Sequence, residues 1–383
     1  MSMTDREQQI VALLRQDPMI SSAAIADRLG TTRGSVNVHL SNLGKKGVVL
    51  GRGYILGESP GVVVIGGANV DVLARSTARA LAGTSNPGRA SLTPGGVGRN
   101  VAENLARLGT RTQLVTAIGR DPMGDNLLAQ TAAAGVRLDH VHRTDQPTGT
   151  YTAVLDTDGE LIVAVSDMGA TAELGPDCVN AARDLIASAA LLVLDGNLPL
   201  PTLAHALDLA TAAGVRTIFE PVSVPKARLA APYLDVDRPL YAVTPNRDEL
   251  TALTELPTRG DRQLRAAADD LHHRGVQHVW VRLGERGSML STEGAEPVFL
   301  PALPAALEDV TGAGDAMLGA FCHGLLDGRD PVDAARFGHA AAALTIASPH
   351  TVRADLTPRL VESALQAGLT NSPSTRKARS TVR

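Results

Sequence analysis

The chain has 383 residues, 44% hydrophobic and 20% charged, which is enough for two domains and a large core. No apolar run reaches the roughly eighteen residues of a membrane span, and the N-terminus lacks the apolar region of a signal peptide. We therefore expect a cytoplasmic protein with no membrane partner. Cys178 and Cys322 are too few for a metal cluster, and we expect both to be buried free thiols.

The formal net charge of −4 is unevenly distributed along the chain. Residues 1–58 carry seven Lys/Arg and five Asp/Glu, which gives +2, whereas the remaining residues carry 29 and 35, which gives −6. A small basic segment ahead of an acidic body is typical of a nucleic-acid-binding appendage.

Residues 1–57 are predicted to form three short helices followed by a hairpin. Thr4 and Glu7 have the spacing of a capping box, Ser22 opens a second helix that Gly30 ends, and a third begins near Arg33. Apolar segments 48–50 and 54–56 flank Gly-Arg-Gly, which predicts a two-stranded hairpin. The whole arrangement resembles a winged helix-turn-helix domain.

That resemblance implies that residues 1–57 bind duplex DNA, with Arg52 at the tip of the wing. The third helix would be the recognition helix and would present Arg33, Ser35, Asn37 and His39. Domains of this kind also serve as dimerisation or packing modules, and this alternative stays open.

A continuous apolar run at 62–65 predicts a buried strand, which ends in Gly-Gly-Ala-Asn-Val-Asp at 66–71. In an open α/β sheet, ligands bind beyond the carboxyl ends of the strands. Asn69 and Asp71 fall at that point, and a carboxylate can accept hydrogen bonds from two sugar hydroxyls. The alternative is that Asp71 is an ordinary residue of a turn.

The rest of the chain alternates between helical and strand patterns, which predicts an α/β fold with a doubly wound, mostly parallel sheet. Segments 149–155 and 160–165 flank Thr-Asp-Gly and predict a hairpin. The expected core strands are 113–117, 191–194, 217–219, 241–243 and 278–283, and the expected helices include 101–108, 126–134 and 203–213. Residues 370–383, rich in Ser, Thr and Arg, are predicted to be a disordered basic tail.

Residues 308–317, Glu-Asp-Val-Thr-Gly-Ala-Gly-Asp-Ala-Met, place small residues and an acid at the start of a helix. At Gly312, Ala313 and Gly314 the backbone amides can approach an anion closely, and the helix dipole favours negative charge there. Asp315 follows at the position of a general base for a hydroxyl nucleophile. A P-loop is excluded because Gly-Lys-Ser/Thr is missing, and a dinucleotide fingerprint would need glycine in place of Met317. A simple Gly-rich turn is the alternative.

Residues 309–315 resemble the C-terminal signature of the ribokinase/PfkB family of sugar and nucleoside kinases. Residues 94–100, Pro-Gly-Gly-Val-Gly-Arg-Asn, resemble its partner signature, in the right order and roughly two hundred residues upstream. The resemblance covers about residues 61–365. It implies a ribokinase-like kinase domain over residues 58–369, with a small β lid over the sugar that excludes water. Because such lids often clasp a second subunit, we expect a homodimer.

The resemblance also implies roles for individual residues. Asp315 would be the base, and the amides of 312–314 would hold the phosphoryl group that Mg²⁺–ATP donates. Glu249, in the element Asn-x-x-Glu, would order the hydrated Mg²⁺. Asp309, with backbone oxygens around 347–351, would form a monovalent-cation site for an ion such as K⁺. Substrate contacts are expected at Asn69, Asp71, Asn86, Gly95, Gly96 and Asn100, and ATP contacts at Asn246, Gly284, Gly287 and His339.

Two residues depart from the family pattern. Arg282 replaces a small hydroxyl residue, so that it either meets phosphate directly or faces solvent, and Glu220 stands where aspartate is more usual. Segments 66–71, 85–88, 100–106 and 221–223, with Lys226, nevertheless look most like the pseudouridine kinases of this family. They predict ATP-dependent phosphorylation of pseudouridine at the ribose 5′-hydroxyl.

Two alternatives to that prediction stay open. One is another nucleoside or ribose kinase of the same family, and the other is a transcription regulator that senses a nucleoside. The presence of both Asp315 and Glu249 argues against the regulator, because a pure sensor needs neither residue.

Overall fold

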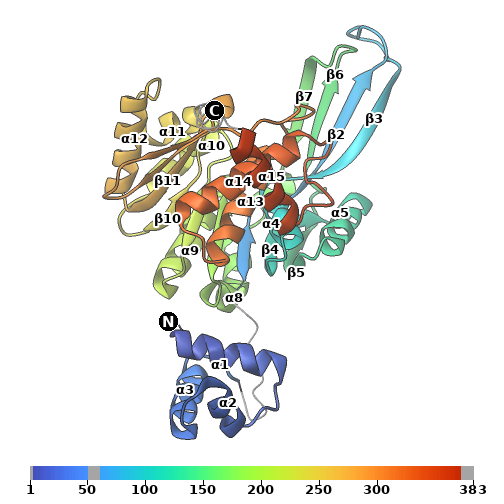
Figure 1. Cartoon of the computed structure of the whole chain (residues 1–383). Helices are drawn as coiled ribbons and strands as arrows, with labels where there is room; N and C mark the ends of the chain where they lie inside the picture. The colour runs from blue at the N-terminus through green and yellow to red at the C-terminus, as the bar shows by residue number, and fades with distance from the viewer. Residues whose placement is uncertain (1–2, 51–60, 372–383) are drawn as a thin grey trace. The chain divides into compact units, whose positions relative to one another are not determined.

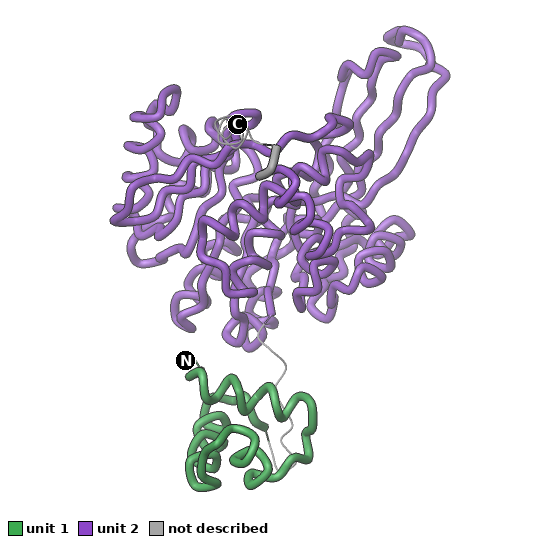
Figure 2. Tube along the Cα trace, viewed as in Figure 1, with its two compact units in different colours: residues 1–60 green, residues 61–383 purple. Residues whose placement is uncertain are grey.

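The computed structural model describes residues 3–50 and 61–371. The chain divides into two compact units, residues 1–60 and residues 61–383, which Figure 2 shows in different colours. The boundary predicted from the sequence, between residues 57 and 58, lies three residues before this division.

The small unit contains the three expected helices, α1 (Asp5–Gln16), α2 (Ser22–Leu29) and α3 (Arg33–Lys45). Gly30 ends α2 in the left-handed conformation with φ 59°, and Thr32 caps α3 two residues later, so the turn between the helices is tight. Of the expected hairpin, residues 51–56, with Arg52, lie outside the described residues.

A compact apolar core holds the small unit together. Its fully buried side chains come from all three helices and are Ile10, Leu14, Ile25, Val36 and Leu43. Glu7 completes the capping box of α1 with Thr4, and its carboxylate also pairs with Lys46 Nζ at 2.7 Å. This ion pair fixes the start of α1 against the end of α3.

The large unit is built on a nine-stranded sheet with the order β13-β12-β11-β10-β9-β8-β1-β4-β5. Its strands are β1 (Val62–Ile65), β4 (Thr112–Gly119), β5 (Arg137–Thr144), β8 (Leu191–Asp195), β9 (Thr217–Glu220), β10 (Leu240–Val243), β11 (Val276–Arg282), β12 (Ser288–Thr292) and β13 (Val298–Leu300). Neighbours from β11 to β5 pair in parallel, and β12 and β13 add an antiparallel edge. The predicted α/β fold with a mostly parallel sheet is therefore confirmed.

Helices cover both faces of this sheet. Successive side chains of each strand point to opposite sides, so each strand contributes to two separate cores. Val63 and Ile65 of β1 belong to one core cluster, and Val62 and Val64 belong to the other. The first cluster is closed by α7 (Pro176–Ala181), α8 (Arg183–Ala187), α9 (Leu200–Ala213), α10 (Val224–Ala230), α11 (Arg247–Thr254) and α12 (Asp261–His273). The second is closed by α4 (Val97–Arg107), α13 (Ala313–Leu326) and α14 (Pro331–Ile346).

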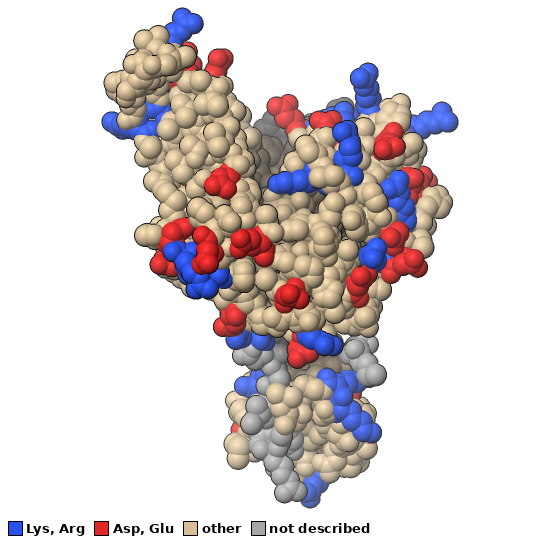
Figure 3. Space-filling model, turned by 180° about the vertical axis from the view of Figure 1, so that it is seen from behind, with Lys and Arg blue, Asp and Glu red and all other residues tan. Residues whose placement is uncertain are grey.

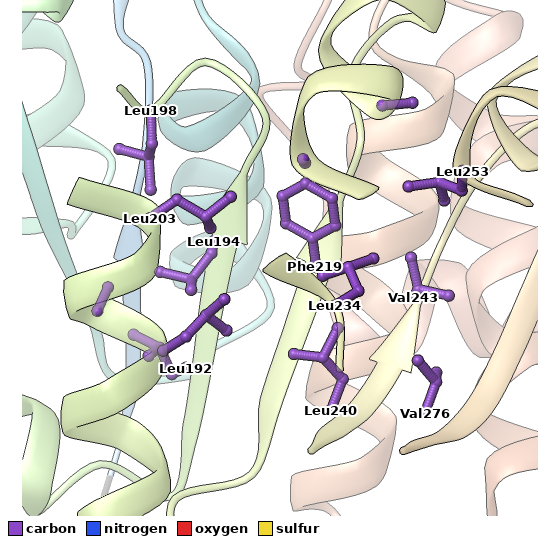
Figure 4. Close-up of a cluster of buried hydrophobic side chains, with 14 of the residues drawn as sticks. Leu192, Leu194, Leu198, Leu203, Phe219, Leu234, Leu240, Val243, Leu253 and Val276 are labelled. Atoms are coloured by element: carbon purple, nitrogen blue, oxygen red, sulfur yellow. The ribbon is translucent and has the colours of Figure 1, made fainter. Parts of the chain in front are cut away.

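Figure 4 shows part of the first cluster, where Leu203 of α9 lies beside Leu194 of β8, with Phe219 on the neighbouring strand. Aliphatic side chains thus fill most of this core. The remaining helical segments are α5 (Pro122–Ala133), α6 (Gly169–Ala172), η1 (Ala231–Tyr233), η2 (Gly284–Arg286) and α15 (Pro358–Asn371). Because α15 continues to Asn371, residues 370 and 371 are helical, and the rest of the predicted tail, residues 372–383, lies outside the described residues.

A second sheet of four strands projects from the large sheet as the lid (Figure 1). Its order is β3-β2-β6-β7, with β2 (Asn69–Ser76), β3 (Gly88–Gly95), β6 (Thr150–Leu155) and β7 (Leu161–Asp167). β6 and β7 form the predicted hairpin, and β2 starts four residues after β1 ends. The lid is therefore joined directly to the carboxyl end of a central strand.

One face of the lid is apolar and exposed. Leu92, Val163 and Val165 are each more than half exposed, and their register places them on the face opposite Asp71. In Figure 3 the lid, at the upper left, shows few charged side chains along its length. The homodimer expected through the lid stays a prediction. Among the described residues, no helix is long and apolar enough to cross a bilayer.

Candidate active site

Asp315 lies in the first turn of α13, directly after the glycine turn. Gly312 caps this helix with φ 78°, and a Cβ added there would overlap the carbonyl oxygen of Thr351, so only glycine fits. The amide of Ala313 donates to Val310 O at 3.3 Å, whereas no described residue accepts from the amides of Gly312 and Gly314. Those two amides stand at a helix N-terminus, where an anion is favoured.

The Asp315 carboxylate accepts a hydrogen bond from Asn100 Nδ2 at 2.7 Å. Burial raises the pKa of Asp315 to about 7, against the opposing effect of this hydrogen bond. A carboxyl group that is half ionised near neutral pH is suited to accept a proton from a hydroxyl group.

Arg99 holds Asn100 in place, a role that the sequence analysis did not assign. Its buried guanidinium donates to Asn100 Oδ1, to the carbonyl oxygens of Pro94 and Gly95, both at 3.1 Å, and to Glu103. The side-chain oxygen of Asn100 is thereby occupied, which leaves the amide nitrogen to face Asp315. Arg99 is thus a positioning residue within the motif at 94–100.

Asn69 and Asp71 lie together at the base of the lid, with Asn69 Nδ2 2.7 Å from Asp71 Oδ1. Desolvation raises the pKa of Asp71, against the hydrogen bond from Asn69. A Cβ at Gly95 would overlap the Asp71 carboxylate, and one at Gly96, where φ is 92°, would lie 2.5 Å from Ala68 Cα. Both glycines therefore let the lid base approach the start of α4, which carries Asn100.

Asp195, at the end of β8, joins three segments of the site. Its fully buried carboxylate accepts hydrogen bonds from the amides of Gly67 at 2.9 Å, Gly98 at 2.8 Å and Asn197 at 2.9 Å. Asp195 was not predicted as a site residue, although it follows the apolar run 191–194. The rule that singled out Asp71, an acid at the carboxyl end of a buried strand, would have found it.

Glu249 and Glu220 lie beside Arg282, which packs against the glycine turn. Glu249 Oε2 accepts from the Asn246 amide at 2.8 Å in a capping box at the start of α11. Both carboxylates also contact Arg282 Nη2, Glu220 at 2.6 Å and Glu249 at 3.3 Å. Burial, and then the charge of Glu220, raises the pKa of Glu249.

Glu249 suits a magnesium ion that is bound together with phosphates, whereas both oxygens of Glu220 already accept hydrogen bonds from Val222, Arg282 and Thr244. Mg²⁺ takes oxygen ligands, keeps several waters, and is usually held by one or two carboxylates plus substrate phosphates. The described residues contain no cluster of three or more His, Cys, Asp or Glu that could hold a metal by themselves. Phosphate and water would therefore supply the other ligands.

The His339 side chain has a hydrogen-bond partner inside the large unit. It is only 8% exposed, and its Nε2 lies 2.7 Å from Ser288 Oγ, which also accepts from Trp280 Nε1. Burial lowers the pKa of His339 to about 4, so the ring is neutral at pH 7. Because Nε2 faces Ser288, only Nδ1 is left for a ligand, and the predicted contact with adenine stays a prediction. Gly284 and Gly287, with φ of 61° and 88°, form the turn between β11 and β12, and their contact with ATP stays a prediction.

Asn86 lies in the loop between β2 and β3, away from Asp71. Its side chain accepts from the Leu81 amide and donates to the carbonyl oxygens of Leu81 and Thr84. The last pair of β2 and β3 before this loop is Ser76–Gly88, five positions from Asp71, or about 17 Å along a strand. Within one chain, Asn86 therefore stabilises its own turn, and the predicted substrate contact has no support there.

The remaining predicted residues divide between two places. Asp309 accepts from the Thr311 amide at 2.8 Å, and its own amide donates to Ile346 O, so residues 308–312 lie beside 346–351. The monovalent-cation site stays a prediction.

On α3, Arg33 and Asn37 are exposed one helical turn apart, while Ser35 and His39 are partly buried.

Comparison with known proteins agrees with this geometry. The sequence pattern of the pfkB family carbohydrate kinases matches residues 59–357, and that of a winged helix-turn-helix DNA-binding domain matches residues 3–49. The uncharacterized sugar kinase YeiI of Escherichia coli K12 is 34% identical over 90% of this chain and 94% of its own length. The pseudouridine kinase of the same organism is 32% identical over 78% and 94%, and Arabidopsis thaliana ribokinase is 30% identical over 76% of each.

Solved structures show the same fold. Arabidopsis thaliana ribokinase complexed with ribose and ATP covers 81% of this chain and 99% of its own, with a TM-score of 0.72 and 27% identity. A carbohydrate kinase from Agrobacterium tumefaciens covers 80% and 96%, with a TM-score of 0.69 and 30% identity. The chain therefore belongs to the pfkB family of carbohydrate kinases and carries an N-terminal winged helix-turn-helix domain.

Proposed function

We propose that this protein transfers the γ-phosphoryl group of ATP to the ribose 5′-hydroxyl of pseudouridine. The observation that carries the transfer step is the pairing of Asp315 with Asn100, beside the two amides of the glycine turn that no described residue uses. Base and anion site thus stand within three residues of each other.

In this reaction Asp315 accepts the proton of the 5′-hydroxyl as its oxygen attacks the γ-phosphorus. The bond between that phosphorus and the β,γ-bridging oxygen breaks, and ADP leaves. The amides of Gly312 and Gly314 stabilise the negative charge on the phosphoryl oxygens. Mg²⁺, bound with the phosphates beside Glu249, would neutralise part of their charge.

The ribose would lie on Asp71 and Asn69 at the base of the lid, where a carboxylate and an amide offer partners for its hydroxyls. The Arabidopsis ribokinase structure contains ribose and ATP, and the Escherichia coli relative is a pseudouridine kinase. Both substrates contain ribose, so these residues support a ribosyl substrate of either kind. The pseudouridine-kinase-like segments at 66–71 and 221–223 favour the nucleoside. A ribokinase activity is the second candidate.

Pseudouridine is expected to exceed uridine in kcat/KM by at least roughly tenfold. Its C–C glycosidic bond leaves an N1–H donor where uridine has only C–H. When uridine binds a site built for this donor, the acceptor in the site has no partner. Steady-state kinetics with both nucleosides and ribose measure the ratio. Comparable kcat/KM for uridine or free ribose would contradict the substrate proposal and leave kinase activity intact.

We also propose that residues 1–57 bind duplex DNA through α3. Replacing the exposed Arg33 by Gln is expected to weaken binding and to reduce the slope of log K against log salt by about one, because one phosphate contact is lost. Arg265→Gln, in the kinase unit, is the matched control and should bind like the wild type. Electrophoretic shifts with fragments from around the protein's own gene measure this. No retardation at low salt, with or without nucleoside, would favour a packing role.

A further inference from the structure

Arg282 is the last residue of β11. It lies where β11 meets the end of β9 and the start of α11. Its side chain is 20% exposed. Its Nη2 is held by Glu220 at the end of β9 and by Glu249 of α11. The solvent-facing position left open by the sequence is therefore wrong, because the guanidinium turns inward between two carboxylates.

The other edge of the guanidinium faces the glycine turn. A Cβ added at Gly314 would lie 2.5 Å from Arg282 Nη1, so this nitrogen is packed against the first turn of α13. No described residue accepts a hydrogen bond from Nη1 or from the buried Nε. Nη2 is thus held by carboxylates, whereas Nη1 presents unused donors beside the free amides of Gly312 and Gly314.

The negative charges around Arg282 favour a positively charged side chain at this position. The negative charges of Glu220, Glu249 and Asp315 all act on Arg282, and a polyphosphate would bring more negative charge to the same place. A guanidinium is ionised at any working pH and offers paired donors that match phosphoryl oxygens. Glu220 binds the guanidinium of Arg282 through Nη2 only, so Nη1 stays directed at the glycine turn.

We propose that Arg282 is a catalytic residue that contacts the transferred phosphoryl group through Nη1, an inference that rests on the proposed ATP-dependent function. The step keeps the balance already described: the phosphorus–oxygen bond to ADP breaks, the bond to the substrate oxygen forms, and Asp315 takes the proton. Arg282 carries no proton in this step. It offsets the charge on the equatorial oxygens of the phosphoryl group, as arginine side chains do in other phosphoryl transfers.

Arg282→Gln tests the proposal through binding and through turnover. AMP-PNP carries a γ-phosphoryl group joined through nitrogen, whereas AMP carries none. With Mg²⁺ omitted, calorimetry should show that the variant binds AMP-PNP at least about tenfold more weakly than the wild type does, while its affinity for AMP stays within about twofold. With Mg²⁺–ATP, kcat should fall roughly 10²–10³-fold, with a smaller change in the KM for the nucleoside. Arg265→Gln is the matched control and should change neither quantity, because Arg265 is a partly exposed residue of α12 that pairs with Glu296.

Arg282→Lys separates a phosphate contact from a merely structural ion pair. The lysine keeps the charge near Glu220 and Glu249 but lacks the second donor edge, so it should restore the melting temperature more fully than kcat. It also provides the measurement if Arg282→Gln fails to fold. Loss of AMP and AMP-PNP affinity in equal proportion, or a kcat within twofold of the wild type in either variant, would overturn the proposal.

The AMP-PNP comparison does not depend on which nucleoside is accepted. A wild-type protein that binds AMP-PNP through Arg282 but does not phosphorylate pseudouridine would contradict the substrate and leave the arginine contact supported. If the wild type phosphorylates pseudouridine and Arg282→Gln has unchanged kcat and AMP-PNP affinity, the substrate is supported and the arginine contact is contradicted.

Discussion

Asp315→Asn is expected to lower kcat by about 10²–10⁴-fold, the usual contribution of a positioned general base, with nucleoside affinity within about twofold of the wild type. The amide has nearly the same shape, and it can still pair with Asn100 through its oxygen, but it cannot accept the hydroxyl proton. Steady-state turnover and calorimetric nucleoside binding measure the two effects separately. A variant that keeps more than roughly a third of wild-type kcat would exclude Asp315 as the base.

The pH profile provides a second readout for the same residue. Since burial raises the pKa of Asp315 to about 7 and the base must be ionised, wild-type kcat/KM should rise about tenfold per pH unit below 7 and level off above it. The residual activity of Asp315→Asn should lack that rise. Asp333→Asn, which changes an exposed first-turn acid of α14, is the matched control and should keep the wild-type profile.

The same pKa shift predicts how the substitution affects stability. Folding raises the pKa of Asp315 above its ordinary value of 3.8, so the folded state binds this proton more tightly than the unfolded state does. The contribution of Asp315 to the free energy of unfolding therefore falls as pH rises from about 4 to about 7. Asp315→Asn removes this loss, and its melting temperature at pH 8 should equal or exceed that of the wild type. Lost activity would then not reflect lost folding.

Gly312→Ala is expected to lower kcat by roughly 10²–10³-fold, the effect of losing one preorganised donor from a site of developing charge. Its Cβ would overlap the Thr351 carbonyl oxygen, so the turn must shift and carry the amides away from the phosphoryl group. Kinetics at saturating ATP and nucleoside measure the change.

Gly328→Ala is the control for Gly312→Ala. Gly328 has φ 90°, close to the 78° of Gly312, but no atom lies within 4 Å of its added Cβ. The control therefore carries the backbone strain without the overlap and should lower only the melting temperature. Equal kcat in both variants would show that the position of the turn does not matter for transfer.

The sequence predicted those parts of the site that lie within a single segment. The glycine turn with Asp315, the motif around Asn100 and the strand end at Asp71 each combine backbone geometry and a functional group in a few consecutive residues. The apolar runs of β1 and β8 predicted their strands for a similar reason. β5 was not predicted, since Arg137–Thr144 lies at the edge of the sheet and mixes charged and apolar residues without a continuous run.

The parts that the sequence could not predict depend on partners far apart in the chain. Arg282 is held by Glu220, 62 residues away, and Asp195 holds the amide of Gly67, 128 residues away. No local pattern predicts these partners, although the position of Asp195 at the end of a buried strand marks it as a candidate site residue. Asn86 and His339 show the opposite case, because their family positions suggested ligands, whereas the Asn86 side chain bonds within its own turn and His339 Nε2 bonds to Ser288.

The central claim is that this chain transfers a phosphoryl group from ATP to a ribosyl 5′-hydroxyl. The most direct test is to incubate the wild-type protein with Mg²⁺–ATP and a panel of pseudouridine, uridine, cytidine, adenosine and ribose, and to identify products by mass spectrometry and ³¹P NMR. We predict ADP together with pseudouridine 5′-phosphate, formed faster than any other phosphorylated product. ADP formation with none of these acceptors, or phosphate attached at a position other than the 5′-oxygen, would contradict the account.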